Sequence, residues 1–144
     1  MRALLDVNVL VALFDPDHVH HAAAHAWLEV NGPLGIATCP LTENGLARVL
    51  SSPAYGDPPL RSADIMERLE SFRVSADHEF WPDAVSLRDR SLFRLRAIGH
   101  RQLTDVYLLG LARSHGARLA TFDRSIPLGA VVGAREEHRA LLAA

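Results

Sequence analysis

Short apolar segments and longer segments of helical periodicity alternate along this chain. The expected strands cover residues 2–6, 35–38, 78–81 and 117–123. The expected helices cover residues 7–14, 18–30, 43–50, 62–72 and 105–115. Strands that alternate with helices at this spacing indicate an α/β domain with a short, mostly parallel central sheet and helices on both faces.

Several residues mark where these elements begin and end. Asp17 and Thr104 are in position to cap the helices that follow them, and Gly116 is placed to end a helix. Residues 52–61 contain three prolines and a glycine and are expected to form a loop. With 144 residues and no visible linker, we expect a single domain over 1–144.

The composition of the chain excludes several kinds of functional site. The net charge is −2, so any contact with nucleic acid needs a local basic patch. All 15 cationic residues are arginine, which excludes a Walker A lysine, a Schiff-base lysine and a Ser-Lys dyad. Cys39 is the only cysteine, so no intrachain disulfide can form. We expect a cytoplasmic protein with no membrane segment or signal peptide.

Four acidic residues occupy comparable places in the expected elements. Asp6 and Asp123 lie at the ends of strands, and Glu43 and Asp105 lie in the first turns of helices. In open α/β sheets the carboxyl ends of the strands and the following helix N-termini share one edge, where ligands bind. We therefore expect these four carboxylates to converge there.

Such a cluster favours metal-dependent chemistry. Carboxylates close together repel one another unless a cation lies among them, and Mg²⁺ or Mn²⁺ prefers oxygen ligands. A bound ion of this kind lowers the pKa of water and stabilises the oxygens of a phosphoryl displacement. Taken singly, Glu43 and Asp105 are better explained as helix caps or surface carboxylates, whereas Asp6, between apolar runs, needs a site or a strong hydrogen-bond partner.

The chain resembles the PIN-domain nucleases, and in particular the VapC toxins of bacterial VapBC toxin-antitoxin pairs. The resemblance rests on five stretches that span nearly the whole chain: LLDVNVLVALF, HHAAAHAWL, LTENGLARVL, GHRQLTDVYLLGLARSHGARLATFD and a short helix at the end. It implies a Mg²⁺- or Mn²⁺-dependent endoribonuclease, a homodimer, and inhibition by a VapB-like antitoxin whose C-terminal tail covers the active site.

The resemblance also implies roles for individual residues. The family's acidic quartet falls on Asp6, Glu43, Asp105 and Asp123. Of these, Asp6, Asp105 and Asp123 are the expected metal ligands. The supporting polar groups are Asn8, Thr104 and Thr121.

Two further clusters stand out. Residues 88–101 carry five arginines against one acid, a local charge of +4, and are the expected RNA contacts, unless they merely share a solvated face. These arginines are Arg88, Arg90, Arg94, Arg96 and Arg101. His18, His21 and His25 recur at helical spacing, but no Cys or suitably spaced acid completes a zinc site.

Two other functions compete with a nuclease. A phosphatase of the haloacid dehalogenase type also begins with a strand and an aspartate, but it needs a second Asp where this chain has Asn8, and a lysine that this chain lacks. A catalytically silent PIN-like module that only binds RNA or an antitoxin is the alternative that the residues leave open.

Overall fold

A five-stranded sheet forms the centre of the protein. The computed structural model describes residues 1–143, and every strand pairing within them is parallel, in the order β3-β2-β1-β4-β5. The strands are β1 (Ala3–Leu5), β2 (Ile36–Thr38), β3 (His78–Phe80), β4 (Arg118–Thr121) and β5 (Arg139–Leu141). The first strand of the chain is thus the middle strand of the sheet.

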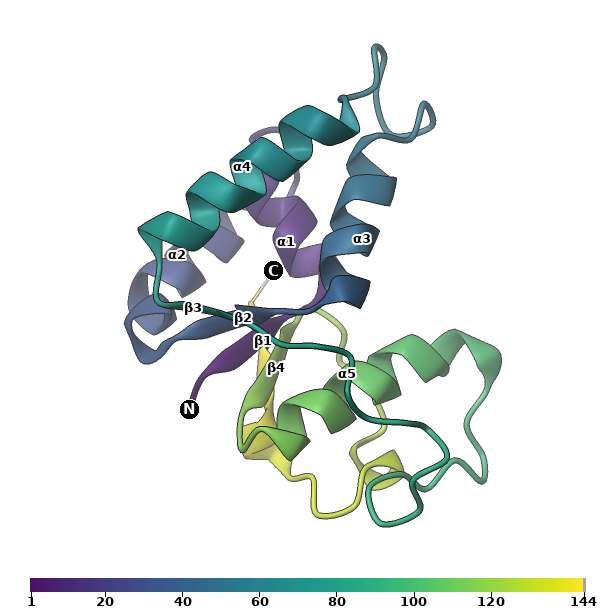
Figure 1. The fold of residues 1–144 in the computed structure, drawn as a ribbon. Helices are drawn as coiled ribbons and strands as arrows, with labels where there is room; N and C mark the ends of the chain where they lie inside the picture. The colour runs from purple at the N-terminus through teal and green to yellow at the C-terminus, as the bar shows by residue number, and fades with distance from the viewer. Residues whose placement is uncertain (144) are drawn as a thin grey trace.

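Helices cover both faces of this sheet (Figure 1). One face carries α1 (Val7–Phe14), α2 (His21–Asn31), α3 (Pro40–Leu50) and α4 (Ser62–Ser75), and the other carries α5 (Leu103–Ser114). Short 3-10 turns are η1 (Gly32–Leu34), η2 (His100–Gln102), η3 (Leu128–Ala130) and η4 (Glu136–His138). No helix within residues 1–143 is both long and apolar enough to cross a bilayer.

Two hydrophobic cores lie on the two faces of the sheet. Ala3 and Leu5 of β1 pack with α1 to α4, whereas Leu4 packs with α5 and the segment after β3. All three side chains are almost completely buried. A central parallel strand is covered on both sides, which explains why this strand reads as a continuous apolar run.

The predicted α/β architecture is confirmed, and three local predictions are wrong. Asp17 does not cap a helix, because its N–H donates to Asp15 in a turn and α2 begins only at His21. Thr104 is not a cap either, since the turn η2 runs directly into α5. Residues 139–141 form β5 beside β4, where a short helix was expected.

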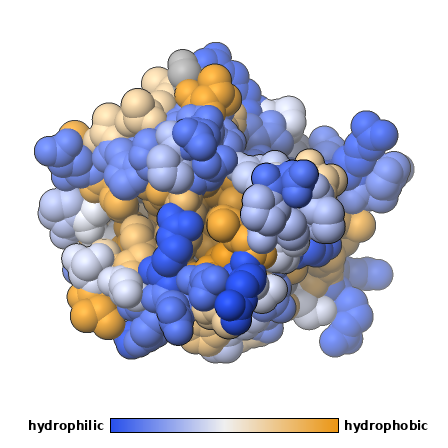
Figure 2. All heavy atoms as spheres, turned by 90° about the horizontal axis from the view of Figure 1, so that it is seen from above, coloured by the Kyte–Doolittle hydropathy of each residue, from blue (hydrophilic) through white to orange (hydrophobic). Residues whose placement is uncertain are grey.

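Apolar surface is also left open on the outside. Seen from above, apolar atoms lie in the middle of one face between hydrophilic side chains (Figure 2). A cavity of about 480 Å³ lies between α1, α2 and α4, and Phe14, Leu28 and Phe72 are among its lining residues.

Candidate active site

Asp6 lies where β1 passes into α1. Its side chain is only 5% exposed, and Oδ1 accepts the Val7 N–H at 2.7 Å, which caps the helix. The second oxygen, Oδ2, accepts the Thr121 hydroxyl at 2.7 Å from the neighbouring strand β4. Burial nevertheless raises the pKa of Asp6, because the two hydrogen bonds offset only part of the lost hydration.

Asp105 and Asp123 lie close enough to Asp6 for the negative charges of these residues to influence one another. Asp105 is in the first turn of α5, and Asp123 follows β4 by two residues. Burial, followed by the negative charges of Asp6 and Asp123, raises the pKa of Asp105 to about 6. The pKa of Asp123 is lowered instead, because the Ser125 hydroxyl and amide donate to its Oδ1 at 2.6 and 2.8 Å.

These three carboxylates have little positive charge to balance them. The positive charge of Arg139 lowers the pKa of Asp123 slightly, but its guanidinium is already bonded to the carbonyls of Arg124 and Ile126 and to Glu136. Oxygen donors with uncompensated charge suit a hard divalent cation. Within residues 1–143, however, no three acidic, His or Cys side chains are already close enough to hold a metal ion. The donor chemistry fits Mg²⁺ or Mn²⁺, and binding requires the carboxylates to draw together.

The fourth predicted acid, Glu43, makes its hydrogen bond outside the aspartate group. It is in the first turn of α3, and its Oε2 accepts the hydroxyl of Thr38, the last residue of β2, at 2.7 Å. Gly45 allows α3 to pack closely on α1, because a Cβ there would lie 2.6 Å from Val7 Cγ2. Glu43 therefore lies near the start of α1 but hydrogen-bonds to Thr38 and not to an aspartate.

The predicted supporting groups differ in their surroundings. Thr121 is fully buried, and besides donating to Asp6 it accepts the Asp123 N–H at 3.0 Å. Asn8 and Thr104 are exposed in the first turns of α1 and α5, and neither side chain has a hydrogen bond within the described residues.

Two contacts of the site were not predicted from the sequence. Ser125 follows Asp123 by two residues, a spacing typical of a side-chain turn that could have indicated it. Thr38 could not be found this way, because its role depends on the packing of α3 against β2.

The arginine-rich segment is exposed and leads directly into α5. Its five arginines make no ion pair within residues 1–143. The segment is tethered by Phe93, which is buried against α5, and by the Arg94 N–H, which donates to the Ala130 carbonyl at 2.8 Å. All five arginines are exposed, and the segment lies on the α5 side of the sheet (Figure 1).

The three histidines of the expected α2 region bind backbone groups. His21 and His25 contact the carbonyls of Ala12 and Leu13 at 2.7 and 3.2 Å, which ties α2 to the end of α1. His18 accepts the N–H of His20 at 3.0 Å. The contacts of His21 and His25 explain their spacing as packing between α1 and α2, whereas His18 lies in the turn before α2.

Comparison with known proteins assigns the fold to a family. The PIN domain family matches residues 3–130. Ribonuclease VapC44 of Mycobacterium tuberculosis is 46% identical over 99% of this chain and 100% of its own length. Ribonuclease VapC38 of the same organism is 45% identical over 86% of each chain. The crystal structure of M. tuberculosis VapC20, described as a Sarcin-Ricin loop cleaving toxin, superimposes with a TM-score of 0.65 at 13% identity, covering 92% of this chain and 98% of VapC20.

The family match covers β1 to β4 and the helices between them, and therefore every acid of the site. The similarity to the two mycobacterial ribonucleases extends over most of both chains. This protein therefore belongs to the PIN domain family and, within it, to the VapC proteins.

Proposed function

We propose that this protein is a VapC-type endoribonuclease that hydrolyses RNA phosphodiester bonds with the help of Mg²⁺ or Mn²⁺. The observation that carries the proposal is the group of Asp6, Asp105 and Asp123, in which burial and mutual repulsion raise the pKa of two members. Folded proteins hold such uncompensated charge mainly at functional sites. The names of the mycobacterial relatives support RNA as the substrate.

The three aspartates would hold the metal ion. When bound, the ion supplies an acidified water and stabilises charge on the phosphoryl oxygens. Thr121 keeps Asp6 and the turn at Asp123 in place through its two hydrogen bonds. Ser125 holds Asp123 ionised, because both of its donors favour the charged carboxylate. Glu43 is the remaining acid of the site and would orient the attacking water.

The first test is cleavage of total cellular RNA by wild-type protein and by Asp6→Asn, each with Mg²⁺, Mn²⁺ or EDTA. We expect discrete fragments only from the wild type with metal, because asparagine preserves the helix cap but removes the charge of a ligand. If folded, antitoxin-free wild-type protein gives no fragments under any condition, the catalytically silent binding module becomes the better description.

We further propose that the exposed arginines of residues 88–101 contact the RNA backbone. Replacing Arg94 and Arg96 together by glutamine should weaken RNA binding. The slope of the logarithm of the binding constant against the logarithm of the salt concentration should become shallower by about 1.4, since each phosphate contact with a single strand contributes about 0.7 to that slope. The control is the pair Arg48→Gln, in α3, and Arg61→Gln, directly before α4, because these helices lie on the face of the sheet opposite to α5 (Figure 1). Filter binding between 50 and 300 mM salt measures both slopes, and equal slopes in the two double variants would assign no phosphate contact to Arg94 and Arg96.

The similar proteins also support a proposal about partners. A structural neighbour, VapBC2 from Rickettsia felis bound to a DNA fragment from its promoter, has a TM-score of 0.55 at 16% identity and covers 85% of this chain and 89% of its own. We propose that this chain likewise binds a cognate VapB-like antitoxin, that it forms a homodimer, and that it acts in the cytoplasm.

A further inference from the structure

A continuous hydrogen-bonded path leads from the edge strand β3 to Glu43. Thr38 is fully buried, and its Oγ1 lies 2.7 Å from Glu43 Oε2 and 2.7 Å from His78 Nε2. The three residues come from β2, α3 and β3. No other hydrogen bond to the Glu43 side chain is present within residues 1–143.

The direction of these bonds follows from the number of protons. A threonine hydroxyl has one proton, and an ionised carboxylate can only accept, so the Thr38 proton points to Glu43. The Thr38 oxygen must then accept from His78, which requires a proton on Nε2. Burial, and then the charges of Arg73 and Arg2, lower the pKa of His78, so the ring is neutral near pH 7.5 and its single proton is on Nε2.

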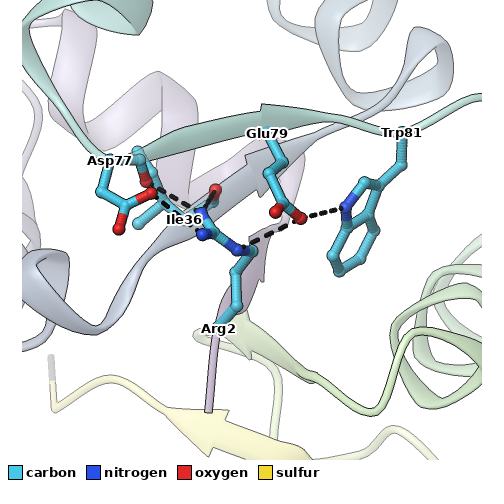
Figure 3. Close-up of polar contacts among 5 residues, drawn as sticks. All are labelled: Arg2, Ile36, Asp77, Glu79 and Trp81. Atoms are coloured by element: carbon cyan, nitrogen blue, oxygen red, sulfur yellow. Dashed lines mark hydrogen bonds and ion pairs between the residues drawn. The ribbon is translucent and has the colours of Figure 1, made fainter.

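The position of His78 is set from the opposite face of the sheet. Asp77 and Glu79, its two neighbours, are both bound by Arg2 (Figure 3). The Arg2 guanidinium donates to the Ile36 and Asp77 carbonyls at 2.9 and 3.0 Å and to Asp77 Oδ1 at 2.9 Å, and it lies 3.2 Å from Glu79 Oε1.

A second contact holds the same strand. Trp81, which is 4% exposed, donates from Nε1 to Glu79 Oε1 at 3.0 Å (Figure 3) and stacks on His115. Side chains alternate between the faces of a strand, so these contacts on one face direct His78 toward Thr38 on the other. A three-residue edge strand would otherwise be free to slip in register.

We propose that His78 is a positioning residue that acts through Thr38 to hold the Glu43 carboxylate in the orientation needed for RNA cleavage. The inference rests on the proposed nuclease function, since it assigns Glu43 a part in the reaction. It goes beyond that function because neither Thr38 nor His78 belongs to the acidic quartet. Without the donor at His78, the Thr38 hydroxyl is free to rotate and the Glu43 side chain loses its single fixed partner.

The variants separate the hydrogen bond from the shape of each residue. Thr38→Val keeps the shape and removes the hydroxyl, and it should lower kcat about tenfold with little change in KM. Thr38→Ser should retain most of the activity. His78→Leu should lower kcat about threefold to fivefold, and His78→Gln, which presents an N–H donor at a similar distance, should recover most of this loss.

A control and a double variant distinguish positioning from a general loss of structure. His18→Leu removes an imidazole from the turn before α2, where its only hydrogen bond within residues 1–143 is to the His20 N–H, so it should leave kcat unchanged. In a Glu43→Gln background, His78→Leu should cause no further loss of cleavage, because its effect passes through Glu43. An equal further loss in that background, or equal kcat for His78→Leu and wild type, would overturn the proposal.

A measurement without RNA keeps this inference separate from the nuclease function. Long-range ¹H–¹⁵N NMR of the metal-free wild type at pH 7.5 should show His78 as the Nε2–H tautomer, and Thr38→Val should abolish this preference. Observation of the Nδ1–H tautomer in the wild type would contradict the hydrogen-bonded path. The predicted tautomer in a protein that does not cleave RNA would reject the nuclease function and, with it, the role assigned to His78.

Discussion

Replacing Asp105 by asparagine is expected to lower the rate of RNA cleavage by a factor of about 10³ or more. The same change is expected to make the metal-free protein more stable. The loss of cleavage follows from removing a charged metal ligand. The gain in stability follows from the pKa of about 6, because a carboxyl whose pKa is raised above its ordinary 3.8 costs folding energy once it is ionised.

Because the pKa of Asp105 is raised in the folded protein, the stability gained in Asp105→Asn should depend on pH. Below about pH 4 Asp105 is protonated in both folded and unfolded chains, and the wild type and the variant should have similar stability. As the pH rises from 4 through 6, the wild type loses stability relative to Asp105→Asn. At pH 7.5 the free energy of unfolding of Asp105→Asn should exceed that of the wild type by about 1–2 kcal/mol, a figure that allows for the partial exposure of Asp105.

Thermal unfolding in EDTA measures this difference, and a rise in Tm of about 3–6 °C is expected at pH 7.5. Glu29→Gln, which removes one exposed carboxylate from α2, is the matched control and should leave Tm within about 1 °C. A lower Tm for Asp105→Asn than for wild type at pH 7.5 would show that the carboxylate stabilises the fold, contrary to the repulsion described for the site.

The second large effect is expected at Gly110, in the middle of α5. A Cβ at this position would lie 2.2 and 2.3 Å from Cε1 and Cζ of Phe93, which is buried. Gly110→Ala should therefore lower the free energy of unfolding by about 2 kcal/mol. This net loss already includes the gain of roughly 1 kcal/mol that alanine brings over glycine inside a helix. The corresponding fall in Tm is about 5–8 °C.

Two further variants locate the cause of this loss. At Gly129 no atom lies within 4 Å of an added Cβ, so Gly129→Ala should change Tm little. Phe93→Leu vacates the space that the new methyl group needs, so the double variant with Gly110→Ala should be more stable than the sum of the single changes predicts. Strict additivity would mean that Phe93 and Gly110 are not in contact.

Much of the fold could be predicted from the sequence because its signals are local. The apolar strands, the helical periodicity and the stop at Gly116, which has a φ of +63°, each depend on neighbouring residues. The start of α5 was misplaced because a 3-10 turn before it has no distinct pattern. Strand β5 was missed because three residues at the end of the chain are recognisable only by their pairing with β4.

In the site, too, the features set by local sequence could be predicted, and those set by tertiary packing could not. The sequence placed Asp6, Asp105 and Asp123 at one edge correctly, since strand ends and helix starts determine that edge. The local turn of Asp123 with Ser125 was within reach of the same reasoning. The bond between Thr38 and Glu43 was not, because it depends on how closely α3 approaches the sheet and on an edge strand held by Arg2.

The place of β1 in the middle of the sheet also determines when a newly made chain acquires its site. Asp6 is synthesised well before its partner Thr121, which comes 115 residues later. Asp105 and Asp123 also belong to the last third of the chain, and strand β4 must be complete before they meet Asp6. An unfinished chain on a ribosome, which is itself made largely of RNA, therefore lacks the assembled carboxylate group. The carboxylate group of the site therefore forms only late in the synthesis of the chain.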